Sequence, residues 1–240
     1  METSNPLLKR EDAFSTAWAR GESMTLQGVV NKTGVLLLLC MASATYAWTH
    51  PALRGPLLVI GLIGGLIACL VGTFKPNVSP IAAPTYALLE GLALGAISQV
   101  IEQRFPGIVL NAMLLTFGVL GAMLAAYTTR TIVVTERLMK GVFAATAAIC
   151  LVYLIDMLLG FFGHRVPFIH ESGPVGIVIS LVIVGIAAFN LLVDFAVIED
   201  SVRRSSPRFM EWYCGMSLLI TLVWLYLEIL RLLAKLRGRD

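Results

Sequence analysis

The stretch from residue 210 to residue 234, MEWYCGMSLLITLVWLYLEILRLLA, is an almost unbroken apolar run near the end of the chain. A helix rises about 1.5 Å per residue, and about 20 mainly apolar residues are enough to cross the hydrocarbon core of a bilayer. The run has this length and lacks the alternation of apolar and polar residues that is typical of a strand. It therefore predicts a membrane-spanning helix.

Six more runs of this kind precede it in the 240-residue chain. Hydrophobic residues make up 58% of the sequence and charged residues 14%, whereas an ordinary soluble domain has about 45–50% and about 25%. Prolines stand at most of the breaks, as they do at helix boundaries. The six runs cover residues 30–49, 55–74, 79–101, 106–129, 138–163 and 175–199. The sequence thus predicts an all-α integral membrane protein, a bundle of seven transmembrane helices that has the lipid bilayer as its partner.

The chain divides into a polar N-terminal tail (1–28), a seven-helix membrane domain (29–236) and a short basic tail (237–240). The N-terminal residues are mixed and polar, so we expect no cleavable signal peptide. Lysine and arginine are commoner in loops 2, 4 and 6 than in loops 1, 3 and 5, which predicts that the even loops and the N-terminus are cytoplasmic. The even loops and their flanks hold Lys75, Arg130, Arg137, Lys140, Arg203, Arg204 and Arg208; the odd loops hold Arg54, Arg104 and Arg165.

The end of the chain departs from this charge rule. Arg231, Lys235, Arg237 and Arg239 would lie on the outer side after seven crossings. Either the last segment crosses against the rule or it is re-entrant.

Several functions are disfavoured by composition. A net charge of +3 is too small to predict nucleic-acid binding. The four cysteines lack the spacing of a metal site or a disulfide framework. The three histidines fall in expected loops, and no serine or cysteine has an evident buried base, so we expect no enzyme, no resident metal and no cofactor beyond transiently bound Ca²⁺.

Four carboxylates interrupt the apolar runs: Glu90, Asp156, Asp194 and Glu228. An ionisable side chain near the bilayer centre costs at least about 2.5–3.5 kcal/mol, so we expect these groups to face the interior of the bundle. Burial disfavours the ionised form, and some of them should hold a proton at neutral pH.

Counted from the cytoplasmic ends of their runs, the acids lie at increasing depth. Asp194 is about 8 Å in, Glu90 about 16 Å, and Asp156 and Glu228 about 27 Å. Asp194 and Glu228 are then too far apart to touch. Such a ladder is typical of a cation or proton pathway. Several unrelated structural ties between helices would give the same pattern.

The neighbours of the acids predict partners for them. Asn190 is one turn before Asp194 and can hydrogen-bond it, and Arg231 follows Glu228 by three residues, the spacing of an intrahelical ion pair. Ser217 and Thr221 lie on the more polar face of the last run. Glu90 directly precedes Gly91 and Gly95, whose spacing allows close approach of another helix. In the structural reading, Glu90 ties the third run to the seventh.

Four segments resemble the bacterial branch of the Bax inhibitor-1 (transmembrane BAX inhibitor motif) family over residues Met24 to Leu236. They are MTLQGVVNKTGVLLLL, PTYALLEGLALGAIS, NLLVDFAVIED and EWYCGMSLLITLVWLYLEILRLL. The resemblance implies a seven-helix bundle with a central last helix, in the bacterial cytoplasmic (inner) membrane. It also implies a pH-sensitive calcium leak gated by two interacting aspartates on the last two helices. Some bacterial relatives are linked to a membrane-bound AAA protease. The first family aspartate matches Asp194, whereas the second falls on Thr221, which cannot titrate.

Two hypotheses follow. In the first, the protein is a calcium or proton leak gated by protonation, with Asp194 as the gate, Glu90 as its partner or part of the pathway, and Asp156 and Glu228 as further acids. Neutral, hydrogen-bonded acids would keep the bundle closed, and deprotonation would open it by repulsion. In the second, the protein is a non-conducting membrane regulator of a membrane-bound protease or of a stress response, and the acids are structural.

Overall fold

The computed structural model describes residues 23–161 and 173–238 of the chain. The regular structure of this part consists of helices, apart from one isolated bridge between Ser23 and Pro207. Its helices are α2 (Leu26–Thr49), α3 (Arg54–Phe74), α4 (Ser79–Arg104), α5 (Ile108–Thr128), α6 (Glu136–Phe161), α8 (Pro174–Arg203) and α9 (Met210–Arg237), with short 3₁₀ turns η1 (Pro51–Leu53) and η2 (Pro76–Val78). In the described residues, seven helices are long and apolar enough to cross a membrane, which confirms the predicted fold class.

Several helices extend past the apolar runs that predict them. α8 continues from residue 199 to Arg203, and α9 continues from residue 234 to Arg237. α2 begins at Leu26, inside the stretch that we assign to the N-terminal tail. Charged side chains support such ends, because pairs four residues apart lie on one face of a helix. Glu199 with Arg203 and Asp200 with Arg204 form such pairs in the last turn of α8.

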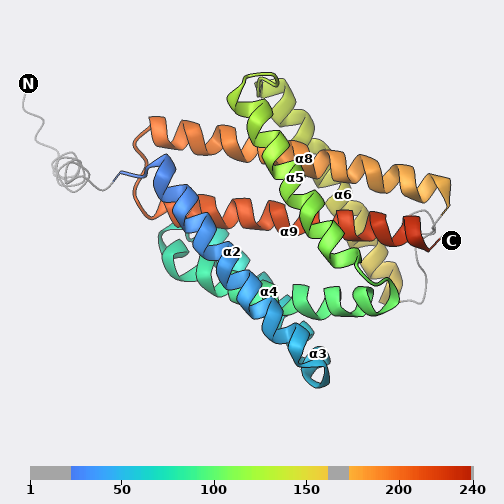
Figure 1. The fold of residues 1–240 in the computed structure, drawn as a ribbon. Helices are drawn as coiled ribbons and strands as arrows, with labels where there is room; N and C mark the ends of the chain where they lie inside the picture. Colours follow the sequence, from blue (N-terminus) through green and yellow to red (C-terminus); the bar gives the residue numbers. More distant parts are fainter. Residues whose placement is uncertain (1–22, 162–172, 239–240) are drawn as a thin grey trace, which may run out of the picture.

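Helix α9 is central, as the family resemblance implies. It packs against α2, α4, α5 and α8. In Figure 1, α9 (red) runs through the middle of the bundle, with α8 (orange) on one side and α2 and α4 on the other. Because it has neighbours on most sides, many of its side chains meet another helix rather than lipid.

Two glycines bring α2 and α4 together. A Cβ atom added to Gly91 would lie 2.0 Å from Ser43 Oγ, and one added to Gly95 would lie 2.2 Å from the carbonyl oxygen of Ala44. Both distances are far below contact distance, so only glycine permits this crossing. The predicted close approach of a second helix is confirmed, and that helix is α2.

Helix α6 is the most peripheral span. It packs mainly on α8, and between Glu136 and Gly160 only Val142 is buried. Apolar side chains that point outward need no protein partner in a membrane, because lipid tails are as apolar as they are. The polar contacts that α6 makes with other helices are therefore what determines its position in the bundle.

Candidate ion site between α8 and α9

Asp194 lies on α8 where it faces α9. Ser217 Oγ donates to Asp194 Oδ1 at 3.0 Å, and Thr221 Oγ1 donates to Asp194 Oδ2 at 2.6 Å. The two hydroxyls are four residues apart, so they stand on one face of α9, one turn above the other. Each carboxylate oxygen of Asp194 thus accepts a hydrogen bond from the central helix.

The buried thiol of Cys214, one turn before Ser217 on α9, is close enough to Asp194 to interact with it electrostatically. Thr221, on which the resemblance places the second family aspartate, does contact Asp194. A carboxylate and two hydroxyls therefore stand where the resemblance implies a pair of carboxylates.

The predicted bond between Asn190 and Asp194 is wrong. Asn190 Nδ2 donates to Thr146 Oγ1 of α6 at 2.8 Å and to the carbonyl oxygen of Ile186 at 2.9 Å. Both donor hydrogens of the Asn190 amide are thus used on α6 and on α8 itself. Asp194, one turn later, instead contacts hydroxyls of α9.

Glu228 lies in a separate cluster further along α9. It is only 1% exposed, and Arg231 Nη1 lies 3.0 Å from both of its carboxylate oxygens, which confirms the predicted ion pair. Tyr153 Oη donates to Glu228 Oε1 at 2.7 Å, and Trp224 Nε1 donates to the same oxygen at 3.2 Å. The Tyr153 bond joins α6 to α9. Asp156, one turn after Tyr153 on α6, is half-buried.

Lys235, in the basic end of the chain, is a buried cation. Its Nζ donates to Ser180 Oγ at 2.8 Å and to the carbonyl oxygen of Gly176 at 3.1 Å. Gly176 and Ser180 share the small-residue face of α8 with Ala187, and all three are buried. That face could have indicated a close helix partner, but not which side chain would fill it.

Glu90 is half-buried on α4 and faces α3. A Cβ atom added to Gly65 of α3 would lie 3.0 Å from Glu90 Oε2. Within residues 23–161 and 173–238, no hydrogen bond or ion pair to Glu90 is found. Cys40, Cys69 and Tyr86 are close enough to interact with it electrostatically. The predicted tie from Glu90 to the seventh run is therefore wrong, because α4 presents this face to α3, and Asp194 has other partners.

Glu211 is a buried carboxylate that we did not predict. It is 4% exposed at the start of α9, and its Oε1 accepts bonds from Thr25 N at 3.0 Å and Thr25 Oγ1 at 3.1 Å. A Cβ atom added to Gly28 would lie 1.9 Å from the same oxygen. Glu211 thus fixes the start of α2 against α9. A carboxylate in the first turn of a helix is too common to have marked this contact.

The acids lie in distinct environments. Among the described residues, no hydrogen bond joins Asp194, Glu90 or Glu228 to another of the three. No group of three or more His, Cys, Asp or Glu side chains in the described ranges could hold a metal ion. Asp194 is the one whose described bonds come from neutral hydroxyls alone, so it can exchange a proton without breaking an ion pair.

Comparison with known proteins agrees with this architecture. No curated protein and no solved structure matches the chain. A protein-family model described as Bax inhibitor 1 like matches residues 5–238, nearly the whole chain. Together with the seven apolar helices of the described residues, of which α9 is the central one, this match shows that the protein is an integral membrane protein that belongs to the Bax inhibitor-1-like family.

Proposed function

We propose that the protein is a slow leak for cations, calcium in particular, whose opening depends on the protonation of Asp194. The observation that supports the proposal most directly is that Asp194, inside a membrane-spanning helix, bonds with both oxygens to hydroxyls of the central helix. The family to which the chain belongs generally contains channels or regulators rather than enzymes. Carboxylate and hydroxyl oxygens also suit calcium as a passing ion.

The absence of a second carboxylate at this contact reverses the expected effect of pH. Ionised Asp194 accepts a charge-assisted bond from each hydroxyl, and such bonds are about twice as strong as neutral ones. A proton on Asp194 removes the negative charge, so both hydroxyl bonds become neutral and weaker. Deprotonation brings no repulsion here, because Thr221 carries no charge. The ionised form therefore holds α8 against α9, and acidification loosens the contact.

Flux measurements in liposomes test this mechanism. We expect calcium entry, read with a trapped dye, to rise as the pH falls, by about fivefold because a change of about 1 kcal/mol shifts a two-state equilibrium by that factor. Asp194→Asn cannot ionise, so its leak should be high and independent of pH. Asp200→Asn, at the exposed end of the same helix, is the matched control. A wild-type pH profile in Asp194→Asn contradicts the proposal.

Thr221→Asp supplies the second carboxylate. Two facing carboxylates repel when both are ionised and share a proton when one is not. In this variant the leak should rise with pH instead, because deprotonation now adds repulsion between α8 and α9. A variant with an unchanged sense of pH dependence would show that this contact does not control opening.

Glu90 is the candidate for the pathway itself. It is half-buried between α4 and α3, and no described side chain neutralises it by an ion pair. Glu90→Gln should lower calcium flux at all pH values while leaving its pH dependence intact, since Asp194 sets that dependence. A parallel measurement with a proton-sensitive dye decides between calcium and protons.

We further propose that the protein lies in a bacterial inner membrane with a cytoplasmic N-terminus. The basic end of α9, which departs from the charge rule, is partly engaged within the bundle: Arg231 pairs with Glu228, Lys235 is buried, and Arg237 Nη1 donates to the carbonyl oxygen of Pro106 at 2.7 Å. Positive charges held in this way weigh less in setting orientation. Labelling of single cysteines at either end of the chain tests the topology.

A non-conducting regulator of a membrane-bound protease or stress response remains the second candidate. The observation in its favour is that Asp194, Glu211 and Glu228 each join two helices, as structural ties do. In that case Asp194→Asn would leave calcium entry at the level of empty liposomes. A pull-down from membranes would then recover partner proteins with the wild type. Substitutions on the outer surface of α6, the most exposed span, would abolish that recovery.

A further inference from the structure

A cavity of about 490 Å³ lies between α2, α4, α5 and α9. It uses a different face of α9 from the ion site: Leu219, Leu222 and Val223 line it, whereas Ser217 and Thr221 face α8. Its volume falls within the range of about 300–1,000 Å³ that is common for ligand sites. We propose that this cavity binds an acyl chain of a membrane phospholipid whose phosphate lies near Arg54.

The lining of the cavity favours an apolar ligand. Its few polar side chains already have partners in the protein: Ser98 Oγ lies 2.6 Å from Tyr226 Oη, and Thr116 Oγ1 donates to the carbonyl oxygen of Ala112 at 2.7 Å. The carboxylate of Glu102 accepts from the backbone nitrogens of Gly107 and Val109, at 2.6 and 3.0 Å. Ordered water needs two to four polar partners, and this lining offers few that are unoccupied. A hydrocarbon chain can fill the cavity without breaking any of these hydrogen bonds.

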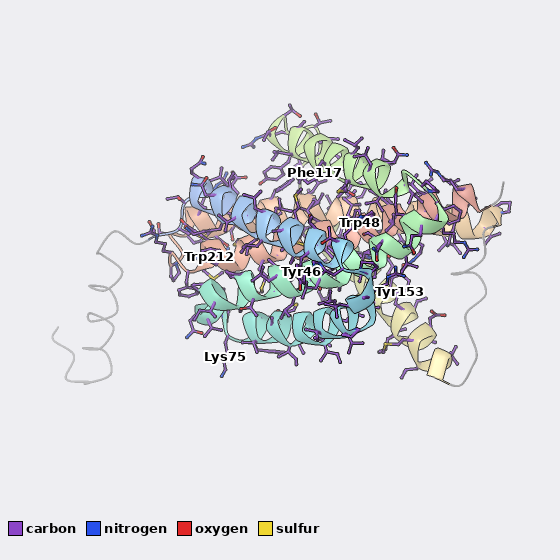
Figure 2. The ribbon with its side chains drawn as sticks, turned by 60° about the horizontal axis from the view of Figure 1, so that its bottom comes forward. Tyr46, Trp48, Lys75, Phe117, Tyr153 and Trp212 are labelled. Atoms are coloured by element: carbon purple, nitrogen blue, oxygen red, sulfur yellow. The ribbon has the colours of Figure 1, made fainter. Side chains whose placement is uncertain are left out.

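The cavity opens toward the bilayer between α2 and α5. Leu110 on α5 and Met41 on α2 line it and are also exposed on the outer surface of the helices. Figure 2 labels Phe117 of α5 and Trp48 of α2, two aromatic side chains that border the cavity from opposite helices. All four surrounding helices are membrane spans, so the medium at this opening is lipid. A lipid chain therefore enters sideways without crossing water.

The positive charge of Arg54 indicates that the lipid has a phosphate head group. Trp48 lines the cavity, and Gln99 Nε2 donates to its carbonyl oxygen at 2.7 Å. Arg54 Nε donates in turn to Gln99 Oε1 at 2.9 Å. Arg54 Nη2 also reaches Gln103 Oε1 at 3.4 Å. These acceptors are neutral, and no ion pair to Arg54 occurs among the described residues. The guanidinium is held in place with its charge uncompensated, which suits a phosphate.

Native mass spectrometry of the purified full chain tests the site, with phosphatidylglycerol supplied during purification. The wild type should retain one phospholipid per chain. Leu110→Trp/Met113→Trp fills the cavity and should reduce the retained lipid by about tenfold, the factor that corresponds to 1.4 kcal/mol. Leu114→Trp is the matched control, since Leu114 lies on the same helix, is 63% exposed and does not line the cavity. It should bind as the wild type does.

A second variant and a second lipid make the test decisive. Met41→Trp fills the cavity from α2 and should lose the lipid even if the double variant folds poorly, with folding checked by circular dichroism. Arg54→Gln should lower the preference for phosphatidylglycerol over a lipid of no net charge by about tenfold, whereas Lys75→Gln at the other end of α3 should not. A wild type that carries only detergent, or filled variants that retain the lipid, would overturn the proposal.

Discussion

Asp194 and Glu228 are both carboxylates inside membrane helices, but their partners differ in charge. Glu228 is enclosed and its charge is neutralised by Arg231, with Tyr153 and Trp224 donating to the same group. Asp194 receives bonds from Ser217 and Thr221, which carry no charge. A carboxylate in an ion pair keeps its charge, because protonation would leave the cation alone. One that is held by hydroxyls can gain or lose a proton and change only its bonds.

The largest effect is expected from breaking the charged cluster. Glu228→Gln removes the negative charge beside Arg231 and should lower the free energy of unfolding by about 2–3 kcal/mol, at the lower end for a broken ion pair because Arg231 can turn toward the interface. Thermal unfolding in detergent measures the loss. An unfolding midpoint equal to that of the wild type would mean that the cluster is not a structural tie.

A double-mutant cycle sharpens this prediction. Tyr153→Phe removes only the hydroxyl that joins α6 to Glu228, so it should cost about 1 kcal/mol by itself. Combined with Glu228→Gln it should cost less than the sum of the two, with a coupling of at least about 0.5 kcal/mol. Additive losses would show that Tyr153 and Glu228 do not act together.

A smaller effect is expected at the hydroxyl contact. Thr221→Val should cost about 0.6–1.7 kcal/mol, the range of hydrogen bonds between membrane helices. The ionised form of Asp194 gains most from the Thr221 hydroxyl. The cost should therefore be largest above the pH at which Asp194 takes up its proton and shrink as the pH falls below it. Unfolding of Thr221→Val and Thr221→Ser at several pH values checks this, since serine keeps the hydroxyl. A cost that does not change with pH would mean that Asp194 does not titrate.

The smallest effect is expected where an ion pair is fully exposed. Lys140 and Glu136 pair across one turn of α6 at 3.5 Å, and both side chains are largely in contact with solvent. Exposed pairs contribute about 0–1 kcal/mol and are screened by salt. Lys140→Met should therefore change the unfolding midpoint little and serves as the reference for the Glu228 variants. If Lys140→Met lowered the unfolding midpoint as much as Glu228→Gln does, burial could not explain why the two ion pairs differ in strength.

Several features that depend on neighbours along the chain could be predicted. The seven spans follow from the length and apolarity of the runs, because a helix satisfies its own backbone groups in lipid. The pair of Glu228 with Arg231 follows from a spacing of three residues, and the close crossing at Gly91 and Gly95 follows from the absence of side chains. Each of these requires only the geometry of one helix.

Partners on other helices could not be predicted in the same way. Asn190 faces Thr146 instead of Asp194, Glu90 faces Gly65 instead of the last helix, and Lys235 reaches Ser180. Periodicity gives the face of a helix on which a residue lies, but not which helix packs against that face. The contact of Glu211 with Thr25 joins residues far apart in the chain and has no local signal.

By itself the sequence determined that the chain is an all-α membrane protein with acids inside its apolar helices, because both follow from the composition of short stretches. Only the tertiary structure decided which acid is neutralised by a cation and which is held by hydroxyls. That difference depends on how each helix is rotated about its axis and on what its neighbour offers at the same depth. Packing fixes both, and packing is a property of the whole bundle.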